Sequence, residues 1–292
     1  MASGRDIRRR IRSIGSTSQI TRAMQMVAAS KMRKAQQAAI DVRPFVRMLY
    51  RIQRVATTHT VLVDEEFTHP LIEVREIRKR AIILVGSDKG LCGALNSNLF
   101  RLAGRYDPHK TLFIAAGRKA AQFVARTRRQ LVAEFPYGDT PRFAESRAIA
   151  AMARDLFLKG EVDAVDLVAT RFVNTLVQQP VKFELLPVGD IRGVEVPGVP
   201  RPGEMSADTT EYLFEPSVDN VIEFLLGHYL NVMVHLVLLN AKASEQSARM
   251  VSMKAATDNA AEMIRDLTLE YNKLRQGRIT QELLEIAGGQ AQ

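Results

Sequence analysis

The chain has 292 residues, of which 46% are hydrophobic and 25% are charged, a composition that supports a compact core and excludes disorder throughout. No stretch approaches about 18 consecutive apolar residues, which argues against a membrane-spanning helix. The single cysteine, Cys92, excludes an internal disulfide and a cysteine-based zinc site, and an aromatic content of 6% with no tryptophan argues against an aromatic-lined nucleic-acid or sugar groove.

Positive charge is concentrated at one end of the chain. The net charge is +9, yet residues 1–58 alone carry 13 basic and two acidic residues, a net charge of +11. Residues 59–216 are balanced, and residues 217–292 carry a net charge of −2. The N-terminal segment is therefore expected to meet a polyanion: nucleic acid, an anionic membrane surface or an acidic protein.

The N-terminal segment is predicted to be one long helix from about Arg5 to Thr57, because apolar or small residues recur at steps of mostly three and four. Residues 1–30 are rich in Arg and Ser, as transit peptides are, but the helical pattern continues past them without a cleavage-like site. The predicted apolar stripe consists of Ile7, Ile11, Ile14, Ile20, Met24, Val27, Ala28, Met32, Ala35, Ala39, Val42, Val46 and Leu49.

The middle of the chain is predicted to be an α/β domain. Ten of the eleven prolines lie between Pro70 and Pro216, which excludes long helices there. Short apolar runs predict strands, and amphipathic segments between them predict helices, so a mainly parallel sheet is expected. The strands are expected at 80–85, 111–115, 131–135, 164–172 and 181–188, and residues 190–210 are expected to form a loop.

The C-terminal segment shows a heptad pattern that predicts a coiled coil. Its stripe is Val232, Leu236, Leu239, Ala243, Gln246, Met250, Met253, Thr257, Ala260, Ile264, Leu267, Tyr271 and Leu274. Because neither long helix is expected to be stable alone in water, we predict that they pack on each other. The predicted fold class is α/β with long helices: an antiparallel two-helix coiled coil (1–58 and 217–287) and a central Rossmann-like α/β domain (75–215).

The two predicted helices differ in length. If their near ends lie at Thr57 and Ser217, the C-terminal helix outruns its partner by 17 residues, roughly 26 Å at a rise of 1.5 Å per residue. Apolar residues continue in this overhang, and exposed apolar surface of this kind marks an interaction site. The end of the helix is therefore expected to sit inside another protein. The residues concerned are Leu274, Ile279, Leu283, Leu284 and Ile286.

Four sequence blocks carry a resemblance that spans the chain. The runs ITRAMQMVAASKMRKAQ (20–36), SDKGLCGALNSNL (87–99), SEQSARMVSMKAATDNA (244–260) and LEYNKLRQGRITQELLEI (269–286) resemble the gamma subunit of F-type ATP synthases, of the bacterial type. The resemblance implies a non-catalytic rotor shaft that couples rotation of a c-subunit ring to conformational changes of catalytic beta subunits. It also implies alpha and epsilon subunits as partners, and a peripheral position on the cytoplasmic face of the bacterial inner membrane.

The same resemblance implies partner-binding residues. Matches to positions that contact the alpha/beta ring are Met24, Lys31, Arg33, Arg249, Arg275, Gln276, Thr280 and Glu282. Matches to the foot that meets the c ring are Tyr212 and Glu215. Without the resemblance, a solvated helix face is the favoured interpretation of Arg275, Gln276, Thr280 and Glu282, and Met24 is also explained by packing in the seam. Tyr212 and Glu215 fit a turn before a helix capped by Ser217 equally well.

Other functions have weaker support in the sequence. The loop Gly86–Gly93 lacks both glycine-rich nucleotide-binding patterns, so it is expected to be a tight strand-to-helix turn with Cys92 buried. The five histidines show no metal spacing, and we expect no cofactor, metal or catalytic site. A basic coiled-coil nucleic-acid binder and a nucleotide-using α/β enzyme remain as alternatives; salt-sensitive nucleic-acid binding would support the first, and nucleotide binding by calorimetry the second.

Overall fold

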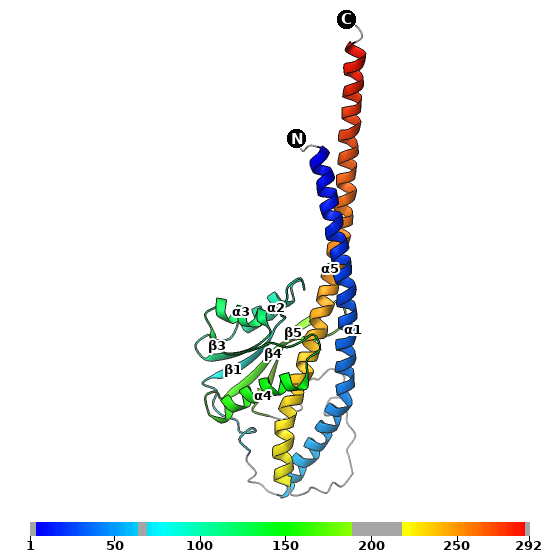
Figure 1. The fold of residues 1–292 in the computed structure, drawn as a ribbon. Helices are drawn as coiled ribbons and strands as arrows, with labels where there is room; N and C mark the ends of the chain where they lie inside the picture. Colours follow the sequence, from blue (N-terminus) through cyan, green and yellow to red (C-terminus); the bar gives the residue numbers. More distant parts are fainter. Residues whose placement is uncertain (1–3, 64–68, 189–217, 290–292) are drawn as a thin grey trace. The chain divides into compact units, whose positions relative to one another are not determined.

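The computed structural model describes residues 4–63, 69–188 and 218–289, and two long helices dominate it (Figure 1). Helix α1 runs Gly4–Val63 and helix α5 runs Val218–Gly289, so both exceed the lengths predicted for them. The chain forms two compact units. The helical unit contains residues 1–29 and 249–292, and the α/β unit contains residues 30–248.

The α/β unit contains a five-stranded sheet with the strand order β3-β2-β1-β4-β5. Strands β1 to β4 are parallel, and β5 is an antiparallel edge strand paired with β4. The predicted mainly parallel sheet is thus confirmed. The elements between the long helices are β1 (Arg80–Val85), α2 (Leu95–Ala103), β2 (Thr111–Ala116), α3 (Arg118–Arg126), β3 (Gln130–Phe135), α4 (Phe143–Leu158), β4 (Ala164–Phe172) and β5 (Gln178–Leu186).

The sheet has a separate apolar core on each face, because successive side chains of a strand point to opposite sides. Ile82 and Phe113 pack with α2 and α3 on one face. Ile83 and Ile114 pack with α4, α5 and part of α1 on the other. Figure 1 shows α2 and α3 together on one side of the sheet and α4 with α5 on the other. The α/β unit therefore has three layers, and the long helices form part of one of them.

Helix α5 is unusually apolar where it crosses the α/β unit. Among the described residues it is the one helix long and apolar enough to cross a membrane, judged by length and composition over Glu223–Gln281. However, 67% of its most apolar window is buried inside the protein, as in the core helix of a globular protein. Packing against the sheet and α4 therefore accounts for its composition.

His235 of α5 makes the stability of the α/β unit sensitive to acid. Its Nδ1 lies 2.9 Å from the Ser146 hydroxyl at the start of α4. Burial lowers the pKa of His235 from 6.5, and the nearby Glu145 carboxylate only partly opposes this. The unfolded chain then binds a proton more readily than the folded chain, so the stabilisation is complete above the ordinary pKa and is lost as the pH falls toward the lowered one.

We therefore expect the melting temperature of the chain to fall as the pH is lowered from about 7.5 to about 5. A His235→Gln variant keeps hydrogen-bonding capacity toward Ser146 but cannot titrate, so this part of the pH dependence should disappear. Circular dichroism at a series of pH values measures both proteins. An unchanged slope in the variant would show that another group is responsible.

Candidate functional site

In the helical unit, α5 follows its predicted apolar seam. Met253 and Ala260 are buried, and Ile264, Leu267 and Tyr271 are half-buried. These positions recur at alternating steps of three and four residues, the spacing of a coiled-coil seam. The predicted C-terminal heptad pattern is confirmed for this part of the helix.

The predicted seam of α1 is confirmed at most of its positions from Ile7 to Leu49, but it is wrong at Ile20 and Val27. Ile20 is 59% and Val27 54% exposed, whereas Thr21 and Ala28 are buried. Counting heptads from Ile7 at steps of four and three leads to positions 11, 14, 18, 21, 25 and 28, so the seam passes through polar residues. Thr21 is accommodated because its hydroxyl lies 2.7 Å from that of Thr257 on α5 and donates to the Ser18 carbonyl oxygen at 3.0 Å.

Because Thr21 rather than Ile20 lies in the seam, we expect alanine to be more destabilising at the polar position than at the neighbouring apolar one. Thr21→Ala should lower the free energy of unfolding by about 1 kcal/mol because it removes a half-buried hydroxyl pair. Ile20→Ala should change it by less than about 0.5 kcal/mol because the side chain is exposed. Denaturant unfolding of the two variants gives the comparison. A larger loss for Ile20→Ala would contradict the observed seam.

Tyr271 marks the level at which α1 begins. A Cβ on Gly4 would lie 3.8 Å from Cε2 of Tyr271. The Arg8 guanidinium lies 5.1 Å from the Tyr271 ring centroid and donates a hydrogen bond to its hydroxyl. This contact was not predicted from the sequence, although a basic first turn opposite an aromatic seam residue is a pattern that indicates a cation–π pair.

Beyond Tyr271, α5 continues without α1. It runs 18 residues further to Gly289, about 27 Å at 1.5 Å per residue, and Figure 1 shows it extending past the start of α1. We call residues 275–289 the C-terminal tip. Ile279, Leu283 and Leu284 are exposed on it, the two leucines to 61% and 67%. The predicted apolar overhang is confirmed for these three residues, whereas Leu274 is half-buried and the side chain of Ile286 lies outside the described ones.

Three of the predicted partner-binding residues lie close together on the C-terminal tip. Arg275, Gln276 and Thr280 are all exposed, and the Thr280 hydroxyl donates to the Gln276 carbonyl oxygen at 2.9 Å. Glu282 belongs to the same helix, but its side chain lies outside the described ones. The tip thus presents polar groups beside exposed apolar ones.

The other predicted site residues have varied surroundings. In the helical unit, Met24 is half-buried and Arg249 is mostly covered by the chain itself. In the α/β unit, Arg33 is exposed, while Lys31 forms an ion pair with Asp139 at 2.6 Å and so has a partner within the chain. The predicted loop 190–210 and the foot residues Tyr212 and Glu215 lie outside the described residues.

The loop after β1 is a tight turn, as predicted. Cys92 is buried, and the Asn96 amide group donates to its sulfur at 3.3 Å and to the Ser87 hydroxyl at 2.8 Å. The Asp88 carboxylate accepts a hydrogen bond from the Arg118 amide, the first of α3, at 3.0 Å. A helix N-terminus that would suit a phosphate is therefore occupied by a carboxylate of the chain.

No group of His, Cys, Asp or Glu side chains suited to a metal ion was found within the part of the chain that the structure describes. The described residues offer a surface suited to binding, which consists of the paired helices, the exposed apolar residues of the C-terminal tip and the polar groups beside them.

Comparison with known proteins agrees with this picture. A family model described as ATP synthase matches residues 3–291. The ATP synthase gamma chain of Opitutus terrae is 48% identical over 301 residues, which cover 99% of this chain and 98% of that protein. The ATP synthase gamma chain of Desulfitobacterium hafniense is 41% identical over 294 residues, again with 99% and 98% covered.

Solved structures share the fold. A chain of the mitochondrial ATP synthase of Euglena gracilis matches with a TM-score of 0.68 and 19% identity, covering 99% of this chain and 93% of that one. A chain from the central stalk and c ring of the Tetrahymena thermophila enzyme matches with a TM-score of 0.62 and 24% identity, covering 81% and 99%. From the full-length family match and these bacterial relatives, the chain belongs to the ATP synthase gamma-chain family.

Proposed function

We propose that this protein is the central rotor shaft of a proton-translocating F-type ATP synthase, and that it couples c-ring rotation to conformational changes of the catalytic beta subunits. It has no catalytic site of its own in this proposal. The observation that carries the proposal is the C-terminal tip, which belongs to the 18-residue continuation of α5 beyond Tyr271 and whose exposed apolar residues require a surrounding surface. Membership of the gamma-chain family supports the alpha and beta subunits as the source of that surface.

The C-terminal tip is the part we propose to turn within the ring of alpha and beta subunits. Arg275, Gln276, Thr280 and Glu282 would bind loops of the beta subunits there, and their place on the exposed tip supports this role. Met24, Lys31, Arg33 and Arg249 would lie nearer the moving lever of beta. The net charge of +11 on residues 1–58 suits acidic loops of such a ring.

The opposite end of the shaft would rest on the membrane ring. We propose three functional domains, 1–58, 75–215 and 217–287, with Tyr212 and Glu215 in a foot that meets the polar loops of the c ring. The epsilon subunit would bind alongside. The complex would be peripheral to the inner membrane on its cytoplasmic face, which fits the bacterial origin of the relatives.

Energetics explain why a shaft needs a continuous seam. Moving one charge through 100 mV supplies about 2.3 kcal/mol, and several such steps must reach each catalytic site. An isolated surface ion pair is worth only about 0–1 kcal/mol and is insufficient for this. Apolar positions such as Met253 and Ala260, repeated along α5, distribute the strain over many contacts.

Reconstitution tests the proposal. Vesicles containing the remaining subunits of the complex are prepared with and without this chain, and ATP-driven acidification is followed with a pH-sensitive dye. We expect proton pumping only when the chain is present. Full coupled pumping without it would refute the proposed role. The full-length family match favours this function over nucleic-acid or nucleotide binding.

A further inference from the structure

A group of charged side chains is buried where α5 meets the sheet in the α/β unit. Lys242 is only 1% exposed. Its ammonium lies 3.1 Å from a carboxylate oxygen of Glu245, 3.7 Å from one of Asp88 and 4.3 Å from the centroid of the Tyr137 ring. We call Asp88, Tyr137, Lys242 and Glu245 the buried charge cluster; Asp139, beside it, is exposed. Charges this deeply buried require specific partners in fixed positions.

The sheet side of the buried charge cluster is held rigidly. Asp88, in the loop after β1, is fixed by the amide at the start of α3. Tyr137, in the loop after β3, donates its hydroxyl hydrogen to the Gly86 carbonyl oxygen at 2.8 Å. Burial, reinforced by the carboxylates of Glu245 and Asp88, raises the pKa of Tyr137 well above its ordinary value, so the phenol remains a donor. Lys242 therefore docks against the ends of two strands.

The loop after β3 also joins the two long helices. Asp139 accepts a 2.6 Å hydrogen bond from Lys31 of α1 and lies 3.5 Å from the side-chain amide nitrogen of Gln246 on α5. The hydrogen bond from Lys31 lowers the pKa of Asp139 despite an opposing effect of burial. One carboxylate thus connects α1, α5 and the sheet.

Apolar and ionic contacts resist movement differently. Apolar packing resists a turn of α5 through the close fit of many side chains, whereas an ion pair depends on the positions of two particular groups. A turn of α5 by one residue would carry the Lys242 ammonium away from Asp88 and Tyr137 into apolar surroundings, which is strongly unfavourable. The buried charge cluster therefore fixes the rotational position of α5 against the sheet.

We propose that the buried charge cluster is the torque-bearing joint between the α/β domain and the two long helices. Lys242 is its central positioning residue: it holds α5 in one angular register, so that torque applied to the α/β domain reaches the helices without slip. This inference rests on the proposed rotor function. The sequence shows Lys242 and Glu245 three residues apart, but it does not show the loops that supply their partners.

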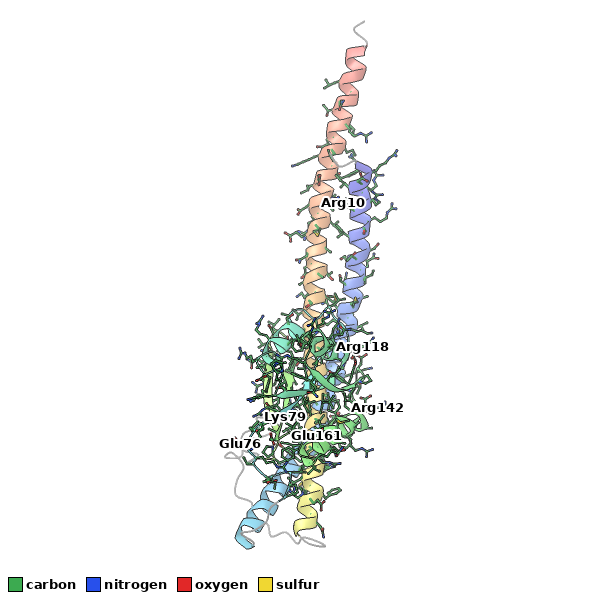
Figure 2. All side chains as sticks on the ribbon, turned by 90° about the vertical axis from the view of Figure 1, so that its left-hand side faces the viewer. Arg10, Glu76, Lys79, Arg118, Arg142 and Glu161 are labelled. Atoms are coloured by element: carbon green, nitrogen blue, oxygen red, sulfur yellow. The ribbon has the colours of Figure 1, made fainter. Side chains whose placement is uncertain are left out.

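Angular fluctuations of single complexes test the joint. The complete complex is immobilised through its catalytic head, and a bead is attached to the α/β domain through a Glu161→Cys substitution. Glu161 is exposed on this domain (Figure 2), and Cys92 is buried, so the new thiol is the reactive one on this chain among the described residues. With the head stalled by withdrawal of ATP, the variance of the bead angle reports the torsional stiffness.

The test variant combines Asp88→Asn, Lys242→Met and Glu245→Gln, which removes the Lys242 charge together with the two carboxylates beside it. We expect the angular variance to rise about twofold, because the contacts of Lys242 with Asp88 and Tyr137, which cross from α5 to the sheet, are lost while apolar packing remains. Asp139→Asn, at an exposed position that should tolerate the change, should give a smaller rise. The control is Glu76→Gln, which removes a fully surface-located pair with Arg78 and should change nothing.

Parent-like variance in folded preparations of both test variants would overturn the joint while leaving rotation by the parent intact. If the triple variant does not fold, Asp88→Asn alone, which leaves Lys242 paired with Glu245, is measured in its place, and a parent-like variance there would overturn the joint. An absence of ATP-driven rotation in the parent complex would instead refute the proposed function, and the joint with it.

Discussion

Replacing Gly117 with alanine is expected to lower the free energy of unfolding of the α/β unit by about 3–5 kcal/mol. Gly117 lies between β2 and α3 with a φ of +91°, a conformation that residues with a side chain rarely adopt. A Cβ there would also collide with the carbonyl oxygen of Gly86 and lie 3.2 Å from Cε1 of Tyr137. Neither the turn after β1 nor the buried ring has space to withdraw.

Gly160 provides a matched control for this prediction. Its φ is +71°, but a Cβ there would meet nothing within 4 Å. Gly160→Ala should therefore cost only the conformational penalty, about 1–2 kcal/mol. Guanidinium unfolding followed by circular dichroism compares the two variants. Coincident unfolding curves would show that close packing at Gly117 adds nothing to the backbone effect.

Placing charges on the C-terminal tip is expected to weaken assembly without affecting the isolated chain. The variant Leu283→Asp with Leu284→Asp removes two apolar side chains that we propose to be buried in the ring, each worth about 1.5–3 kcal/mol. Together they give about 3–6 kcal/mol, so affinity for the alpha/beta head should fall roughly 100- to 10,000-fold at about 1.4 kcal/mol per tenfold change. Because both leucines are exposed in the chain itself, its melting temperature should hardly change.

A second double variant controls for the added charge. Val173→Asp with Leu176→Asp changes two exposed apolar residues at the β4–β5 turn of the α/β unit. Head affinity, measured by titration with labelled chain, should be close to that of the parent. Equal losses in the two variants would mean that charge rather than the C-terminal tip determines binding.

Simple periodicity was sufficient to predict much of this fold. The heptad spacing of α5 predicted which side chains are buried, among them Met253 and Ala260, because a seam depends on position along one helix. The short apolar run at Arg80–Val85 predicted a buried parallel strand for the same local reason. That the C-terminal helix is the longer of the two followed from residue counts and proline positions, although the lengths of 60 and 72 residues differ by less than the 17 predicted.

The seam of α1 shows where periodicity guided by hydrophobicity fails. Choosing the most apolar residues selected Ile20 and Val27, but the helix buries Thr21 instead. Thr21 is acceptable in the seam because a second threonine, Thr257, meets it from α5. The two threonines are 236 residues apart in sequence, so their pairing depends on how α1 and α5 are aligned. The pattern of one segment alone does not reveal that alignment.

The buried charge cluster could not be predicted for a related reason. Lys242 and Glu245 would each be unfavourable in an apolar helix without partners. Their partners Asp88 and Tyr137 come from two loops that the strand order β3-β2-β1 brings to one edge of the sheet. Strand order was left open by the sequence, so this juxtaposition appeared only in the folded chain.

Direct observation of rotation is the most decisive test of the central claim that the long helices of this chain turn as a shaft. Complexes are fixed through the alpha/beta head, and a bead on the α/β domain at Glu161→Cys is followed while ATP is supplied. The account predicts unidirectional, stepwise rotation of the bead in complexes that hydrolyse ATP. A bead that stays fixed during verified ATP hydrolysis would contradict it.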